Sequence, residues 1–410
     1  MSTIAPFRAL RPQPEHAPKV ASRPYDVLNS QEAKVEARGN PLSFLHITKA
    51  EIDLPDSVDI HAEEVYQRAR QNLEAFRQRG ILFRESKPCY YLYRLEMNGQ
   101  AQTGIVCGSS LQDYDNDLIK KHEYTRPEKE EDRINHIAYT GAQTGNVFLA
   151  YRSVDAIDAL VENWKSTHDP VYDFTTEDAI RHTLWVINHD ETIAEITGLF
   201  NTEVPATYIA DGHHRAASAA KVRARLKDKS PESDYFLTTL FPDNQLRILD
   251  YNRVVKDLNG LSADELIEKI RPYFTVTPSA QAVRPAMLHQ FGMYIDGKWY
   301  VLEASPDSYD EDDPIGVLDI TILSSHILEK ILGITDQRTD KRIDFVGGIR
   351  GVKELEQRVN SGEMAVAFSL YPVTLEQLLD IADSGNVMPP KSTWLEPKLR
   401  DGLLTHIIAE

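Results

Sequence analysis

A stretch near the middle of the chain passes abruptly from one secondary-structure pattern to another. An apolar, β-branched segment over residues 204–210 stops at Asp211-Gly212, and a long Ala-rich, basic segment follows directly. This succession predicts a strand, a tight turn and a helix, with Asp211 well suited to the helix N-cap. Gly212 has no side chain, so a ligand could approach the backbone closely at the turn.

His213, His214 and Arg215 fall in the first turn of the expected helix. Unpaired N–H groups and the positive end of the helix dipole already favour an anion there. Two imidazoles and a guanidinium at that place favour a phosphate or carboxylate site over two alternatives, an ordinary capped helix and a metal site. The metal site is the least favoured, because adjacent histidines on a helix point in different directions and are poor joint ligands.

The charge balance limits the partners. The chain has 410 residues, of which 41% are hydrophobic and 26% charged, and its formal net charge is −18. Such a balance argues against a protein that binds duplex nucleic acid or an anionic membrane, since both need a basic face. No apolar run approaches the length of a membrane span, and we expect no signal peptide.

The two cysteines are not expected to form a disulfide. Cys89 and Cys107 flank a predicted hairpin over residues 88–108 that turns at Asn98-Gly99. Pairing outward from that turn places Cys107 opposite Tyr90, so the two thiols face opposite sides of the sheet. This fits a reducing compartment, and we expect a cytoplasmic protein.

Hairpins mixed with helices indicate an α+β fold rather than a doubly wound sheet. The first 60 residues indicate short strands and loops, with one helix at 30–38. In the first half, helical patterns cover residues 61–80, 127–145, 153–166 and 189–200. In the second half we expect strands at 235–241 and 246–255, a hairpin at 291–303 turning at Asp296-Gly297, and helices at 262–271, 318–332, 351–361 and 374–384. We expect an N-terminal region at 1–235 and a C-terminal region at 236–410, or one interwoven unit.

Three further segments carry groups suited to chemistry. Asp26 lies in the Pro-punctuated run Arg23-Pro24-Tyr25-Asp26-Val27, where it is a candidate general base, although a turn aspartate is the plainer interpretation. The run around His122 and Thr125 is dense in charge, and a solvated charged helix explains most of it. Lys391-Ser392-Thr393 is a candidate phosphate-binding triplet, but without the glycines of a Walker loop. His46 closes the run Asn40 to His46, which we expect to combine a turn with a short strand.

Six motifs together resemble one family, in the same order and over nearly the whole length. They are Arg-Pro-Tyr-Asp-Val at 23–27, Asn-Pro-Leu-Ser-Phe-Leu-His at 40–46, His-Glu-Tyr-Thr-Arg-Pro at 122–127, Ala-Asp-Gly-His-His-Arg at 210–215, Asp-Phe-Val-Gly-Gly at 344–348 and Met-Pro-Pro-Lys-Ser-Thr at 388–393. On these motifs the chain is identified as a member of the bacterial and archaeal domain-of-unknown-function family numbered 1015.

The Asp-Gly-His-His-Arg box, residues 211–215, is also similar to the phosphate-binding box of the ParB/sulfiredoxin-like fold, which includes free-serine kinases. The resemblance implies a strand–turn–helix core of that kind, with Asp211, Gly212, His213, His214 and Arg215 around the phosphates of ATP or ADP. It also implies an early acidic residue as base, Asp26 in preference to Glu32. The family often has Tyr-Glu-Thr after the arginine, whereas this chain has Ala216-Ala217-Ser218.

The leading hypothesis is therefore phosphoryl transfer on a small hydroxy amino acid, serine or phosphoserine, in either direction. Asp26, His213 and His214 are the candidate catalytic residues, and Mg²⁺ would share the phosphate charge. The candidate substrate-binding residues are Arg23, Tyr25, His46, His122, Thr125, Lys391, Ser392 and Thr393. No structural metal is expected, and the expected partners are a small substrate, a nucleotide and, as a further candidate, a second copy of the chain.

Two other functions remain open on the sequence. One is a sensor that binds a nucleotide or metabolite without turnover. The other, by analogy with ParB, is a role in DNA partitioning, which the charge of −18 disfavours.

Overall fold

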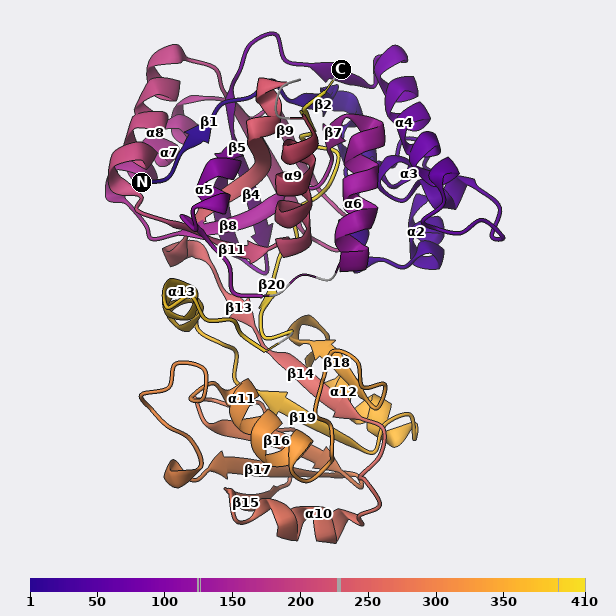
Figure 1. The fold of residues 1–410 in the computed structure, drawn as a ribbon, viewed down its shortest axis with the longest axis vertical. Helices are drawn as coiled ribbons and strands as arrows, with labels where there is room; N and C mark the ends of the chain where they lie inside the picture. Colours follow the sequence, from indigo (N-terminus) through magenta and orange to yellow (C-terminus); the bar gives the residue numbers. More distant parts are fainter. Residues whose placement is uncertain (124, 126, 227–229, 390, 410) are drawn as a thin grey trace. The chain divides into compact units, whose positions relative to one another are not determined.

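The computed structural model describes residues 1–410 except 124, 126, 227–229, 390 and 410. The chain forms two compact units (Figure 1). The first comprises residues 1–246 together with 397–410, and the second comprises residues 247–396. The last residues of the chain therefore return to the first unit. The regions expected from the sequence, 1–235 and 236–410, did not include this return.

The first unit is built on a mixed sheet, nine-stranded in the described part of the chain. Its order is β6-β11-β8-β12-β5-β4-β10-β9, and β1 pairs with the end of β5. β8 pairs in parallel with β12, β6 in parallel with β11, and the other neighbours are antiparallel. The strands are β1 (Ile4–Ala5), β4 (Tyr90–Met97), β5 (Gln100–Ser110), β6 (Ile119–Lys120), β8 (Val147–Tyr151), β9 (Tyr172–Thr175), β10 (Arg181–Ile187), β11 (Thr207–Asp211) and β12 (Tyr235–Pro242).

Helices pack on this sheet through a shared apolar core. α7 (Asp155–Thr167), α8 (Asp190–Glu203) and α9 (His213–Leu226) contribute Ile157, Ile196 and Ala216 to it. α6 (Pro127–Thr140) lies beside α9, and α4 (Glu63–Gln78) lies beside α6 (Figure 1). The remaining helices of this unit are α1 (Ala17–Val20), α2 (Ser30–Ala37), α3 (Leu45–Thr48) and α5 (Leu111–Asp115), and short 3-10 turns lie at Pro14–His16, Tyr25–Val27, Ala50–Asp53, Pro231–Asp234 and Asp243–Gln245.

Two pairs of short antiparallel strands join the N-terminal and C-terminal segments to the rest of the first unit. β2 (Leu10–Pro12) pairs with β3 (Leu82–Arg84), and β21 (His406–Ile407) pairs with β7 (Ala142–Gln143). Single bridges add Leu10 to Thr405 and Ser22 to Asp401. The last residues are thus bound to the N-terminal segment at several points.

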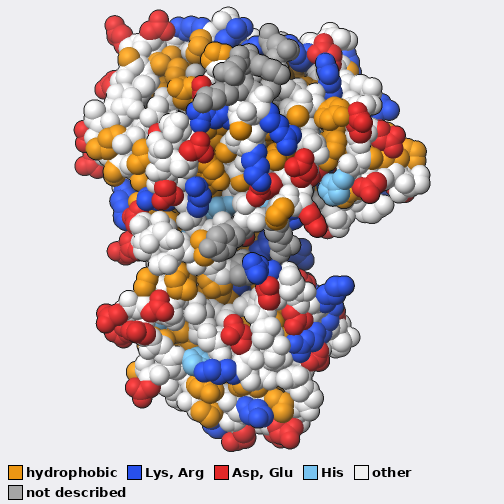
Figure 2. Space-filling model, viewed as in Figure 1, with side chains coloured by type: hydrophobic (Ala, Val, Ile, Leu, Met, Phe, Trp, Pro, Cys, Tyr) orange, Lys and Arg blue, Asp and Glu red, His pale blue; other side chains and the backbone are white. Residues whose placement is uncertain are grey.

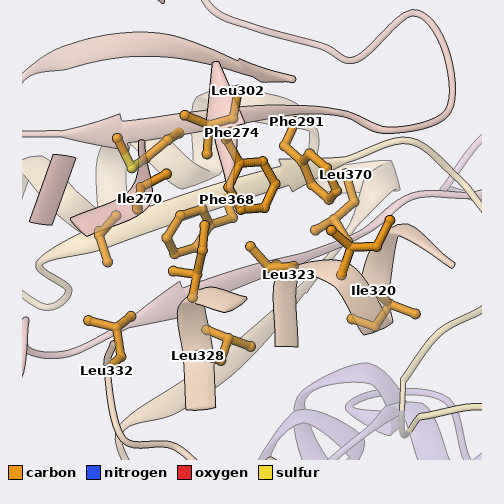
Figure 3. Packing of buried hydrophobic residues seen from close by; sticks show 14 of the residues in the cluster. Ile270, Phe274, Phe291, Leu302, Ile320, Leu323, Leu328, Leu332, Phe368 and Leu370 are labelled. Atoms are coloured by element: carbon orange, nitrogen blue, oxygen red, sulfur yellow. The ribbon is translucent and has the colours of Figure 1, made fainter. Parts of the chain in front are cut away.

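The second unit is a six-stranded sheet, in the order β15-β17-β16-β19-β14-β18, with helices packed on it. Phe274 and Phe291 meet edge to face in its core, with ring centroids 5.5 Å apart (Figure 3). The strands are β14 (Tyr251–Val255), β15 (Phe274–Ser279), β16 (Gln290–Ile295), β17 (Lys298–Ala304), β18 (Ile343–Gly347) and β19 (Val366–Leu370), with a separate pair of β13 (Ile248–Leu249) and β20 (Trp394–Leu395). The helices are α10 (Ala263–Ile270), α11 (Asp319–Leu323), a π-helical stretch at Ser324–Glu329, α12 (Gly351–Asn360) and α13 (Leu375–Asp383), with 3-10 turns at Pro306–Ser308 and Gly348–Arg350.

The α+β prediction is confirmed, and so are both hairpins. Met97 pairs with Gln100 around Asn98-Gly99, and Ile295 pairs with Lys298 around Asp296-Gly297. The turn residues all have positive φ, as such tight turns require. Cys89 and Cys107 are both free and buried.

Several local predictions were wrong. The expected strand before His46 is instead the short helix α3, and much of residues 1–60 forms short helical segments. Phe44, Leu45 and Ile47 in that segment are all buried. A helical turn packed between neighbouring elements can bury side chains on several sides, whereas an edge strand with one exposed face would leave alternate side chains exposed. The helix expected at 127–145 ends at Thr140, because Gly141 has φ +65° and β7 begins directly after it.

Candidate functional site

The box at 211–215 lies at the junction of β11 and α9, as its sequence predicts. β11 ends at Asp211, Gly212 has φ +101°, and α9 begins at His213. The predicted N-cap role of Asp211 needs correction. Gly212 is the residue before the helix, and its carbonyl accepts the N–H of Ala216 at 3.0 Å.

The carboxylate of Asp211 faces cations instead. Its Oδ2 lies 3.1 Å from Nζ of Lys398 and 3.5 Å from Nη2 of Arg215. Burial opposes the charge of Asp211, but Lys398 and Arg215 outweigh it and lower the pKa of this carboxyl. Asp211 is therefore ionised over the whole physiological range.

Arg215 is the centre of the site. Its side chain is only 9% exposed, and its Nη2 lies 3.3 Å from Oδ2 of Asp26, which is 189 residues earlier in the chain. Nη1 donates to the carbonyl of Asn146. Burial opposes the guanidinium charge, but the carboxylates of Asp26 and Asp211 more than offset it and raise the pKa of Arg215. We refer to Arg215, Asp26, Asp211 and Lys398 as the Arg215 cluster.

Two glycines leave room for this guanidinium. A Cβ at Gly212 would lie 3.2 Å from Cζ and Nε of Arg215, and a Cβ at Gly145 would lie 3.2 Å from its Cδ. Both distances are tighter than ordinary van der Waals contact. Gly212 therefore has two roles: it adopts the positive φ of the turn, and it lets the side chain of Arg215 pack close to the backbone.

Asp26 and Tyr25 belong to the short 3-10 turn Tyr25–Val27. The side chain of Asp26 is 32% exposed, so a substrate can reach it. The Tyr25 ring packs under the guanidinium of Arg133, whose Cζ lies 3.9 Å from the ring centroid. Arg23 does not join the cluster in the structure, because its Nε donates to Glu36 at 2.6 Å.

His122 and His213, two buried histidines near the box, are not cations at neutral pH. The rings of His122 and His213 meet edge to face with centroids 4.5 Å apart, and the backbone N–H of His122 lies 3.4 Å from Nε2 of His213. Burial lowers the pKa of His122 to about 4 and lowers that of His213 well below its ordinary value. These imidazoles can offer polar atoms to a ligand but no charge, so the cationic charge here comes from Arg215 and Lys398.

The other predicted residues have separate surroundings. His214 is half-buried in the first turn of α9, and Thr125 hydrogen-bonds the carboxylate of Glu130, which pairs with Lys221. His46 pairs with Asp53, with 2.7 Å between Nδ1 and Oδ1, and its pKa is raised by that hydrogen bond. The pairing of His46 with Asp53 fits a structural role for His46.

Lys391, Ser392 and Thr393 belong to the second unit. Ser392 donates to the carbonyl of Pro389 at 2.6 Å, and Lys391 has φ +58° with its Nζ 5.9 Å from the ring centroid of Tyr251. Their approach to the Arg215 cluster stays a prediction.

The sequence analysis did not select Lys398, which pairs with Asp211, or Asp401. Asp401 is 2% exposed and lies beside Arg215, and burial raises its pKa to about 7. A small cavity of about 30 Å³ adjoins Arg215 and is lined by Tyr25, Arg133, His136, Ile137, Gln143, Thr144, Gly145, Val147, Arg215, Ala219, Phe236 and Leu237. The available signal was the charged run Lys398 to Asp401 inside an otherwise apolar C-terminal segment.

The described residues contain no group of three or more His, Cys, Asp or Glu side chains placed to hold a metal ion. Nor does any helix in the described ranges have the length and apolarity to cross a membrane. On the face shown in Figure 2, acidic and basic side chains are intermixed.

Solved structures to which this chain is similar include the following three. A free serine kinase in complex with AMP is 14% identical, with a TM-score of 0.36, and the match covers 75% of this chain and 91% of that one. A conserved hypothetical protein from Pyrococcus furiosus is 16% identical, with a TM-score of 0.35 and 73% and 94% covered. SbnI from Staphylococcus aureus, with a C-terminal truncation, is 10% identical, with a TM-score of 0.37 and 72% and 85% covered. No curated protein matches the sequence.

A family model does match, over residues 4–321, which is most of the chain. Its description is "Protein of unknown function (DUF1015)". The motifs around Asp26, His122 and Arg215 all lie within that range, as the resemblance of the sequence implied. The chain belongs to the DUF1015 family.

Proposed function

We propose that this protein binds the phosphates of ATP or ADP at the head of α9 and transfers a phosphoryl group to or from a small hydroxy amino acid, with serine or phosphoserine as the first candidate. The observation that carries the proposal is the 3.3 Å approach of Asp26 to Arg215. An accessible carboxylate beside a buried guanidinium combines a base with an anion-binding group, and phosphoryl transfer to an alcohol uses both.

The cluster is balanced before a ligand arrives, since Arg215 and Lys398 face Asp26 and Asp211. A phosphate drawn to Arg215 competes with Asp26 for the same guanidinium. Asp26, once released, is free to accept the proton of a substrate hydroxyl. In the reverse direction the same carboxyl returns that proton to the leaving oxygen.

Asp211 stays with Lys398 in this scheme. That pair holds the end of β11 in place, and Gly212 keeps the backbone close to Arg215. His213 and His122, being neutral, offer ring nitrogens to the ligand without adding charge. Mg²⁺, when bound, would supply charge neutralisation for the phosphates.

The test is a turnover assay with the full chain, Mg²⁺, ATP or ADP, and L-serine, with phosphoserine detected by mass spectrometry. The reverse reaction starts from phosphoserine. Asp26→Asn keeps the shape of the side chain but removes the base, and we expect turnover to fall by about 10²–10⁴-fold. Asp56→Asn is a matched control, because Asp56 is 75% exposed and pairs only with Lys34 among the contacts described.

Full turnover by Asp26→Asn would contradict the assigned base. Binding of nucleotide by the wild type without turnover of serine or phosphoserine would favour the sensor over the enzyme. Absence of nucleotide and phosphate binding would contradict the anion site itself.

A further inference from the structure

A third carboxyl group faces Arg215 from the C-terminal segment. Asp401 is paired with Ser22 through its backbone, with N–H to carbonyl distances of 2.9 and 3.1 Å. Its carboxyl accepts a hydrogen bond from the backbone N–H of Tyr25, next to Asp26. These contacts fix Asp401 against the turn that carries the proposed base.

The carboxyl of Asp401 also lies near a residue that lines the small cavity. A Cβ placed on Gly145, which lines that cavity, would lie 3.6 Å from Oδ1 and 4.0 Å from Oδ2 of Asp401. The same point is 3.2 Å from Cδ of Arg215. Because Gly145 has no side chain, Asp401 and Arg215 can both approach this position closely.

One oxygen of this carboxyl has an unmet hydrogen-bonding capacity. Oδ2 of Asp401 is buried and has no hydrogen-bond partner among the described residues. Buried polar atoms without a partner are uncommon in folded proteins and call for an explanation, such as a role in a binding site. Here the carboxyl group that carries this atom lies close enough to Arg215, the proposed anion-binding residue, to interact with its charge.

Burial favours the protonated form of Asp401 and outweighs the opposing attraction of Arg215 and Arg133. Asp26 and Asp211 already balance Arg215 and Lys398, and Arg133 is paired with Asp132 on α6. The neighbouring Arg400 points to Asp178. A third ionised carboxylate would therefore be a buried charge with no cation of its own, and burial raises the pKa of Asp401 to about 7.

We propose that Asp401 is a further ligand-binding group of this site, whose protonated carboxyl donates a hydrogen bond from Oδ2 to the anion held by Arg215. The proposal rests on the proposed function, because it requires an anion at Arg215. Its consequence is that anion and proton are taken up together. When Asp401 loses its proton, the carboxylate repels the anion and competes for the guanidinium.

Inorganic sulfate is the probe, because it stays fully ionised from pH 5.5 to 8.5 and so adds no titration of its own. Calorimetry on the full chain at constant ionic strength should give a wild-type Kd that rises toward tenfold per pH unit above about 7, the limit for one linked proton. Titrations in two buffers of different ionisation enthalpy should show close to one proton taken up near pH 8.

Asp401→Asn keeps a donor of the same shape but cannot titrate. We expect it to bind sulfate at pH 6 within a few-fold of the wild type and to lose the linked proton. Asp178→Asn makes the same change to the carboxylate beside Arg400 and should keep the linked proton uptake. Any contribution from His214 is common to all three proteins, so the difference isolates Asp401. Should Asp401→Asn fail to fold, Asp401→Ser offers a second non-titrating donor.

The outcomes separate the two proposals. A wild-type Kd that does not change with pH, or an Asp401→Asn protein with unchanged proton uptake, overturns the role of Asp401 and leaves the anion site standing. A wild type that does not bind sulfate, phosphate or nucleotide at any pH overturns the proposed function as well.

Discussion

At the scale of single residues, Arg215 shows how a charge is kept inside a protein. Burial alone would disfavour the guanidinium, and two carboxylates together with the carbonyl of Asn146 compensate for the lost water. In the proposed function, an anionic ligand replaces Asp26 as the partner of Arg215 without leaving the cation unpaired. The contacts that stabilise the free cluster are therefore the ones that the proposed ligand would replace.

Arg215→Ala should weaken binding of ATP or ADP by about 1.5–3 kcal/mol, the range for hydrogen bonds to charged groups. Asp211 keeps Lys398 as a partner and Asp26 is partly exposed, so the variant should still fold. Arg225→Ala, on the same helix but 56% exposed, should bind within a few tenths of a kcal/mol of the wild type. Equal affinities for all three proteins by calorimetry would mean that the nucleotide site is elsewhere.

Asp401 should leave a signature in the pH dependence of stability. The folded chain holds its proton up to about pH 7, whereas an unfolded aspartate releases it near pH 4. The folded state therefore binds more protons in this interval, and the contribution of Asp401 to stability falls as pH rises from about 4 to 7.

Asp401→Asn should remove that slope. Relative to the wild type, the variant should gain up to about 1.4 kcal/mol in the free energy of unfolding for each pH unit between 5 and 7. Chemical denaturation at several pH values measures the difference directly. A constant difference between the two proteins over this interval would show that Asp401 is ionised throughout.

At the scale of elements, local chemistry predicted the hairpins and the box well, because their turns depend on residues that adopt positive φ. Asn98-Gly99, Asp296-Gly297 and Gly212 all do so in the structure. Segments without such signals were predicted less well. The apolar run before His46 is compatible with strand or helix by composition, and only packing against its neighbours selects α3.

Gly212 offers a test of the box as an element. An alanine there would be strained at φ +101°, and its Cβ would press on Arg215 at 3.2 Å. We expect Gly212→Ala to lower the free energy of unfolding by about 1–2 kcal/mol and to weaken sulfate binding. Gly198→Ala is the matched control in α8, where a Cβ meets nothing within 4 Å, and it should raise stability by about 0.5–1 kcal/mol. The same effect from both substitutions would rule out a special role for Gly212.

At the scale of the whole molecule, the site depends on contacts that no local pattern contains. The sheet of the first unit places β11 between β6 and β8, and the Arg215 cluster joins residues 26, 211, 215 and 398. Residue types and spacing selected Arg215, whereas Asp26 was preferred over a plain turn aspartate because of the resemblance to free-serine kinases. Lys398 and Asp401 reach the site only because the end of the chain returns to the first unit, which periodicity cannot foresee.

That return leads to a prediction for a chain that ends at Glu396. Residues 397–410 contribute the buried side chains of Leu399, Leu403, Leu404, Ile407 and Ile408 to the first unit. Burial of each stabilises the fold by about 1.5–3 kcal/mol, so their joint loss is comparable to the roughly 5–15 kcal/mol that keep a whole domain folded. The truncation also removes Lys398, the Asp401 bridge to Ser22 and the pairing of β21 with β7.

We therefore expect the truncated chain to lose the folded first unit and all binding of sulfate and nucleotide, while the second unit keeps its structure. The core around Phe274, Phe291 and Phe368 lies wholly within residues 247–396, so that segment expressed alone should fold and serve as the control (Figure 3). Limited proteolysis with mass spectrometry should find residues 247–396 protected in all three proteins and residues 1–246 cleaved only in the truncated one. A truncated chain whose first unit resists protease and still binds sulfate would show that the site is complete without Lys398 and Asp401.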